Sequence, residues 1–314
     1  MFILNVNILK MRKLVKISFF VVFSCLSHSI NAQQDPQFTQ YFDNALFVNP
    51  AYAGSTGMLT ATTIHREQWV GFDGRPSSTT LSLHSPLSYE SVGLGLTAVR
   101  DQIGPLNQTM FYGDFSYSFK LSKKSKLAFG LKGGLNIISA NTSELQTTQS
   151  DDPNLLQNIQ NKINPNFGTG IYYHNPSFFI GAATPKIIEQ SIDGSETNKE
   201  RRHYFVIAGG IIKINEYWKI RPTSQLKLTV SAPISIDLSL TAIYRDKFYI
   251  GSMYRLNAAF GSYAQYQFNK QFRIGLATDF STTAIRNYNY GTFEILVSYD
   301  FAFNRNGIRS PRYF

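Results

Sequence analysis

Short stretches in which apolar and polar residues alternate recur along most of this chain. The clearest is 234–241, where aliphatic residues alternate with Ser, Asp, Ser and Thr. A period of two is typical of a β-strand with one apolar face and one polar face. The stretches stop at turns and begin again, so the pattern predicts an all-β fold from about residue 59 onward.

The alternation predicts fourteen strands, and most have about the 9–11 residues that cross a bilayer at a tilt. The predicted strands are 59–70, 78–86, 91–100, 108–120, 125–139, 166–174, 177–184, 202–213, 217–230, 234–245, 247–256, 258–268, 271–281 and 291–303. Two very short connections, 231–233 and Asn257, leave this count open by two strands.

The faces of these strands indicate a membrane barrel. In 217–230, Trp218, Ile220 and Leu226 share one face, whereas Lys219 and Arg221 share the other. The apolar faces are too extensive and too aromatic for the interior of a soluble barrel, and outer-membrane barrels turn the apolar face to lipid. We therefore expect a single antiparallel transmembrane β-barrel over 58–304, with the charged side chains inside.

The connections predict the orientation of the barrel. Outer-membrane barrels have short periplasmic turns and longer external loops. The longest predicted connections, 140–165, 185–201 and 282–290, all follow odd-numbered strands, and every even-numbered strand is followed by a tight turn. We expect the long loops outside the cell and both termini in the periplasm.

The N-terminus predicts an outer-membrane destination independently. Residues 1–32 have a basic start, an apolar run at 17–26 and Ala32 before the expected cleavage, as in a signal peptide. The run is shorter than the roughly 20 residues of a spanning helix. The only cysteine, Cys25, lies in this leader, so the mature chain is expected to have no disulfide; a lipoprotein cysteine is the weaker alternative.

Composition agrees with a barrel and excludes other classes. Aromatic residues make up 14% and charged residues only 16%, against about 25% charged in soluble domains. The net charge is +10, and no basic run with interleaved aromatics suggests nucleic acid, so anionic outer-membrane lipid is the expected partner of the basic residues. We expect no enzyme, cofactor or metal site: Ser82 and His84 share a strand face but lie about 7 Å apart, without a third catalytic group.

Two segments flank the barrel: 33–57, which has no period of two, and a tail at 305–314. The first is rich in aromatic residues, and exposed apolar patches usually meet a partner. It is expected to fold into the lumen as a plug, to dock on a periplasmic partner, or to pack against the base of the barrel.

Several sequence blocks resemble a known family. The blocks run in order from the N-terminal segment to the last strand: 34–41, 48–54, 66–76, 83–87, 101–105, 165–168, 202–205 and 298–301. Together they resemble the PorP/SprF family of type IX secretion system outer-membrane proteins of the Bacteroidetes. The likeness covers nearly all of the mature chain.

This resemblance implies a role in secretion, with the type IX translocon and periplasmic components as partners. One branch of the family supports export and surface attachment of a secreted protein with a type B C-terminal sorting domain, of the gliding-adhesin type. The alternatives are a structural link to the periplasmic secretion ring, and a passive porin that prefers anions. The predicted partner-binding residues are Phe38, Tyr41, Asn49, Tyr52, Arg66, Trp69, Phe72 and Arg75.

Overall fold

The computed structural model describes residues 35–87, 91–141, 158–192, 199–230 and 232–301. The predicted signal peptide with Cys25 and the tail at 305–314 lie outside the described residues. The described chain is almost entirely β-structure, with short 3₁₀ helices before β1 and before β15.

The strands follow the predicted alternation closely. They are β1 Leu59–Glu67, β2 Ser77–Pro86, β3 Val92–Ile103, β4 Leu106–Lys120, β5 Lys126–Ala140, β6 Ile159–His174, β7 Phe178–Thr184, β8 His203–Gly210, β9 Ile212–Lys213, β10 Trp218–Thr229, β11 Ser235–Tyr244, β12 Phe248–Arg255, β13 Ala259–Gln267, β14 Phe272–Ser281 and β15 Thr292–Phe301. The 3₁₀ helices are η1 Tyr41–Phe47, η2 Pro50–Tyr52 and η4 Ala284–Tyr288.

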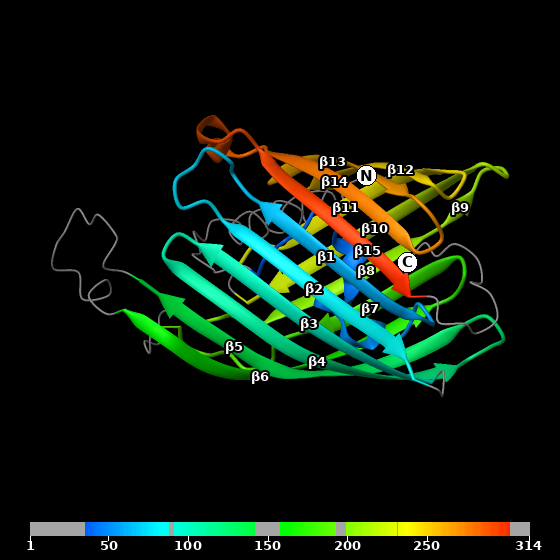
Figure 1. The fold of residues 1–314 in the computed structure, drawn as a ribbon, viewed down its shortest axis with the longest axis horizontal. Helices are drawn as coiled ribbons and strands as arrows, with labels where there is room; N and C mark the ends of the chain where they lie inside the picture. The colour runs from blue at the N-terminus through cyan, green and yellow to red at the C-terminus, as the bar shows by residue number, and fades with distance from the viewer. Residues whose placement is uncertain (1–34, 88–90, 142–157, 193–198, 231, 302–314) are drawn as a thin grey trace, which may run out of the picture. The chain divides into compact units, whose positions relative to one another are not determined.

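These strands close into a barrel (Figure 1). Each barrel strand pairs antiparallel with its neighbours in sequence, β1 pairs with β15, and β10 pairs with both β8 and β11. The two-residue β9 only extends the edge beside β10. The wall is therefore a closed antiparallel barrel of fourteen strands, as the sequence predicts.

The two faces of the wall differ as predicted. Apolar side chains such as Leu96 and Ile250 are 62% and 65% exposed on the outside. Charged side chains such as Arg221 and Glu294 are only 1% and 2% exposed and point inward. An outside this apolar suits hydrocarbon, and the polar groups gather in the lumen.

One predicted boundary was wrong by several residues. Strand β6 begins at Ile159, whereas the alternation predicted 166. Asn161 has a positive φ of 47°, and the pairing register with β5 shifts between Ile138 and Ala140. Such a bulge interrupts the period of two, which hides the first part of the strand from a pattern search.

The two ends of the barrel differ in their connections. At one end, here the tight-turn end, lie the connections after β2, β4, β6, β8, β11 and β13, together with the start of β1 and residue 301 of β15. At the other, the long-loop end, lie 68–76, 141–158, 185–202 and 282–291. No helix among the described residues is long and apolar enough to cross a membrane.

Residues 35–57, here the luminal segment, lie inside the ring of strands (Figure 1). Asp35 contacts Lys186, which follows β7, and His203, the first residue of β8, so it lies toward the long-loop end. Gly54 contacts His84 near the far end of β2, at the tight-turn end. Of the three alternatives for this segment, the structure shows the luminal one.

Candidate functional site in the barrel lumen

The luminal segment is held by side chains rather than by strand pairing. Its backbone–backbone hydrogen bonds run within the segment, for example from the N–H of Asn49 to the carbonyl of Ala45 at 2.9 Å. The strand ladders of the wall close without it. The contacts between segment and wall therefore make up the candidate site.

At the long-loop end, a buried ion triad binds the start of the segment. Arg66 of β1 lies 2.7 Å from Asp279 of β14 and 2.5 Å from Glu294 of β15. Glu294 also accepts the backbone N–H of Thr39 at 2.6 Å and that of Gln40 at 3.2 Å. The carboxylate is thus shared between a guanidinium of the wall and the main chain of the segment, an arrangement of strong charge-assisted bonds.

A second cluster surrounds Asp43 of the segment. Its carboxylate lies 3.1 Å from Arg273 and 3.5 Å from Arg221, and it accepts a hydrogen bond from Gln265 at 2.6 Å. The guanidinium of Arg221 lies 4.0 Å from the ring centre of Phe42, a cation–π contact. Two strands far apart in sequence, β10 and β14, therefore bind one aspartate.

A third cluster binds Asp35. Lys186 lies 2.5 Å from its carboxylate, and Nδ1 of His203 lies 3.1 Å away. Burial alone would raise the pKa of Asp35, but Lys186 and His203 hold it well below its usual value. Burial alone would lower the pKa of Lys186, but the carboxylates of Asp35 and Glu200 hold it above its usual value. This pair is therefore charged across the ordinary pH range.

Between these clusters the wall binds the main chain of the segment. Lys132 of β5 donates to the carbonyls of Leu46 at 3.2 Å and Phe47 at 3.4 Å. Ser116 donates to the carbonyl of Ala53 at 2.7 Å. Asn49 accepts the N–H of Ala51 at 3.0 Å and donates to the carbonyl of Ile171 in β6 at 3.0 Å.

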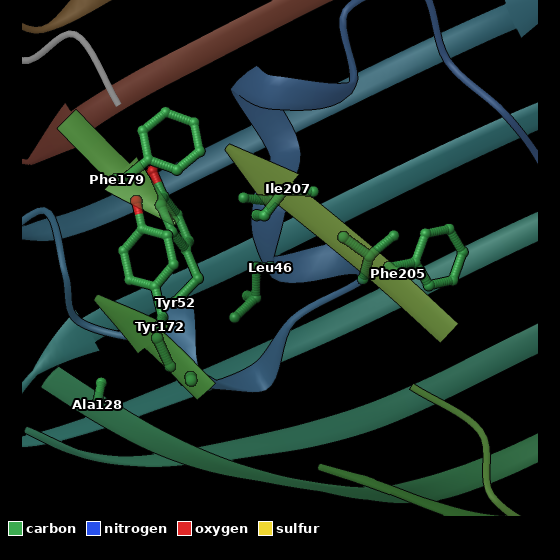
Figure 2. Packing of buried hydrophobic residues seen from close by; sticks show 11 residues of the cluster. Leu46, Tyr52, Ala128, Tyr172, Phe179, Phe205 and Ile207 are labelled. Atoms are coloured by element: carbon green, nitrogen blue, oxygen red, sulfur yellow. The ribbon is translucent and has the colours of Figure 1, made fainter. Parts of the chain in front are cut away.

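Apolar side chains complete the contact on one side of the lumen (Figure 2). Leu46 and Tyr52 of the segment pack against inward-facing residues of β5 to β8. The ring of Tyr52 meets that of Tyr172 edge to face, with centroids 5.4 Å apart. The other residues labelled in this cluster are Ala128, Phe179, Phe205 and Ile207.

Strand glycines make room for the segment. A Cβ at Gly130 would lie 2.1 Å from the backbone nitrogen of Ala51, and one at Gly93 would lie 2.2 Å from the carbonyl oxygen of Ala53. Glycines in strand interiors often mark such close approach of another backbone. At Gly93 and Gly130 the missing side chain therefore permits close packing of the wall against the luminal segment.

A cavity of about 580 Å³ remains beside the segment at the tight-turn end. It lies between Phe42 and Tyr52 of the segment, the start of β1, the end of β15 and the turns around Asp246 and Asn269. The lumen is therefore filled toward the long loops and hollow toward the tight turns.

The loop after β1 forms a separate surface at the long-loop end. Its backbone pairs with 290–291, with the N–H of Val70 donating to the carbonyl of Gly291 at 2.8 Å. Trp69 packs edge to face on Phe72 with centroids 6.5 Å apart, and Phe72 is 41% exposed. Arg75 forms an exposed ion pair with Glu67 at 2.9 Å.

The structure separates the predicted partner-binding residues into two groups. Five of them, namely Phe38, Tyr41, Asn49, Tyr52 and Arg66, are buried in the lumen. Trp69, Phe72 and Arg75 lie together in the loop after β1. Partner binding stays a prediction for all eight, and the buried five contact other parts of this chain.

Sequence reasoning placed the charged strand residues inside the barrel but did not assign Asp279, Glu294 or Lys132 to the site. The alternation of charged residues was the signal for their direction. Their partners in the segment are distant in sequence, 240 residues for Thr39 and Asp279, so no local pattern could pair them. Lys186 lies in a loop and carried no signal.

The family model for type IX secretion system membrane protein PorP/SprF matches residues 30–299. The chain belongs to this family. As a PorP/SprF protein with a transmembrane barrel, it is an outer-membrane protein with a role in type IX secretion. A comparison with curated proteins gave no match.

Solved barrels are similar to this PorP/SprF chain at low identity. The outer membrane protein Omp33 of Acinetobacter baumannii has 8% identity and a TM-score of 0.45, covering 78% of this chain and 98% of that one. The CymD monoaromatic hydrocarbon channel has 12% identity and a TM-score of 0.49, covering 83% and 94%. A FadL homologue of Pseudomonas aeruginosa has 12% identity and a TM-score of 0.46, covering 82% and 94%. These likenesses carry no argument about function.

Proposed function

We propose that this protein supports export and surface attachment of a partner protein with a type B C-terminal sorting domain, of the gliding-adhesin type. Its role is recognition rather than catalysis: lumen and long-loop residues bind the partner, while the tight-turn end faces periplasmic components. The membership of the PorP/SprF family, which spans residues 30–299, carries this proposal. The filled lumen supports it, because a segment bound by three ion clusters fits a binding role better than a permanently open pore.

The first test is a quantitative surface and supernatant proteome of a deletion strain against its complemented parent. Loss of one large protein with a type B sorting domain supports a dedicated partner. Loss of every protein with a sorting domain instead supports a structural link between the outer membrane and the periplasmic secretion ring. An unchanged proteome contradicts both secretion roles.

The alternative function, from a different functional class, is that of a passive porin that prefers anions. Two of the cations that would select anions in an open lumen are already paired in this structure: Lys132 with Asp114 at 3.1 Å, and Arg273 with Asp43 at 3.1 Å. Conductance in planar bilayers separates the two functions. We expect a silent barrel, and a steadily open, anion-selective pore would favour the porin.

A further inference from the structure

The wall holds the luminal segment in the way that a receptor holds a bound peptide. Glu294 accepts two consecutive N–H groups, those of Thr39 and Gln40. Lys132 donates to two consecutive carbonyls, those of Leu46 and Phe47. Main-chain contacts of this kind do not depend on the side chains of the peptide, so the same wall groups fit a different segment that adopts the same backbone conformation.

Cationic pockets on the wall add a preference for carboxylates. Asp43 fills the pocket of Arg221 and Arg273, and Asp35 fills that of Lys186 and His203. Lys227 adds a positive charge near Asp35; it is 5% exposed, and its ammonium has no hydrogen-bond partner among the described residues. A peptide that presents acidic side chains therefore suits this lumen.

The segment can leave without opening the wall. Every strand of the barrel is paired on both sides by other strands, so removal of residues 35–57 breaks no ladder hydrogen bond. The wall groups that would be uncovered include charged and polar side chains, which water can solvate, and apolar side chains such as Phe179 and Phe205, which a replacing peptide would have to cover. The cavity of about 580 Å³ at the tight-turn end lies beside the segment and gives a second peptide a place to enter.

We propose that the lumen is a binding channel for an acidic peptide segment of the exported partner, and that residues 35–57 occupy it as an internal substitute until the partner displaces them. The identity of the occupant rests on the proposed secretion role. The binding channel itself rests on the contacts above, so the two can be tested separately.

Peptide exchange tests the channel without the partner. A protease site inserted after Gly57, which lies in an exposed turn, allows the segment to be cut from the barrel in the purified full-length protein. A fluorescein-labelled synthetic peptide with the sequence of residues 34–57 is the probe. We expect saturable binding to the cut protein, at least tenfold weaker binding to the uncut protein, and at least tenfold weaker binding of a peptide with both Asp35→Asn and Asp43→Asn.

A covalent lock tests whether displacement is needed in the cell. A Cβ at Gly170 would lie 3.0 Å from the side-chain carbon Cγ of Asn49, close enough for a disulfide in the variant Asn49→Cys/Gly170→Cys. We expect the oxidised lock to lower the surface amount of the cargo identified by the deletion proteome at least tenfold. The matched control is the same double variant treated with a reductant, which should deliver as much cargo as the equally treated parent.

The outcomes separate the two proposals. If the cut barrel, verified as folded by its heat-sensitive gel mobility, binds no labelled peptide, the channel is overturned. If deletion removes a cargo but the oxidised lock still delivers it, the displacement is overturned while the secretion role stands. If deletion removes no cargo, the secretion role fails, whatever the peptide does.

Discussion

At the scale of single residues, the buried arginine of β1 is the most connected charge in the site. Arg66 is 2% exposed and forms ion pairs with both Asp279 and Glu294. Two carboxylates at this depth are tolerated only while a cation accompanies them. The arginine therefore supports the binding of the segment indirectly, by holding the Glu294 carboxylate where it accepts the N–H of Thr39.

We expect Arg66→Ala to destabilise the folded protein by about 3–5 kcal/mol, the usual cost of leaving a buried charge unpaired. Arg75→Ala is the matched control, because its pair with Glu67 is exposed and exposed pairs contribute about 0–1 kcal/mol. Urea unfolding of both variants in detergent measures the difference. Equal effects would show that the triad does not hold the fold together.

The charge of Asp35 gives a prediction about pH. Its pKa in the folded protein lies below the ordinary 3.8, so its contribution to stability is present above pH 3.8 and is lost as the pH falls through the lowered value. The charged or titratable groups around it include Lys186, His203, Lys227, Asp101 and Tyr112, and Glu200 also pairs with Lys186. We expect Asp35→Asn to have a lower Tm than the wild type at pH 6, and the difference in Tm to narrow toward pH 3. A difference that stays constant with pH would contradict a contribution from the charge of Asp35.

At the scale of elements, the luminal segment and the strands are separable parts of one fold. The strands are defined by their own ladders, whereas the segment depends on glycines in those strands for its place. A change at such a glycine should therefore act on the segment and leave the wall intact.

We expect Gly130→Ala to unseat the luminal segment, because the new Cβ would lie 2.1 Å from the backbone of Ala51. Gly113→Ala is the control, since its Cβ would meet nothing closer than 3.9 Å. Limited proteolysis should cut residues 35–57 faster in the first variant only, with unchanged far-UV circular dichroism in both. Equal protection in the two variants would mean that the segment adapts to the added methyl.

Much of the element level could be predicted from the sequence, because burial on one face imposes a period of two on every strand. The start of β6 could not be predicted, because the bulge at Asn161 breaks that period. The ion clusters could not be predicted either, because Arg66 and Glu294 are 228 residues apart and meet only where the first and last strands close the ring. The aromatic residues of the segment indicated burial, but not by which wall.

At the scale of the whole molecule, the two ends of the barrel are chemically different. The tight-turn end has exposed lysines, including Lys123, Lys124 and Lys270, and a hollow mouth. The long-loop end is covered by loops bound to the inner wall, such as Ile187, whose N–H donates to Asn166 at 3.0 Å. Two such ends suit two different compartments.

We expect the long-loop end to face the outside of the cell. In Asp73→Cys the thiol should react with a membrane-impermeant maleimide on intact cells, because this exposed residue lies in the loop after β1. Lys123 lies at a tight turn, so the thiol of the variant Lys123→Cys should react with the maleimide only after the cells are lysed. The reverse labelling pattern would show that the barrel has the opposite orientation in the membrane.

The position of the luminal segment constrains how the barrel is assembled. The segment precedes β1 in the chain, and Phe38 packs on Ile64 of β1 and Leu296 of β15, the two strands that meet where the ring closes. Glu294, which binds Thr39, lies on the same β15. If the ring closed first, the segment would have to thread in through one mouth. If the ring instead closes around a segment already in place, no threading is needed. The last strand, β15, then docks on the first residues of the folded chain.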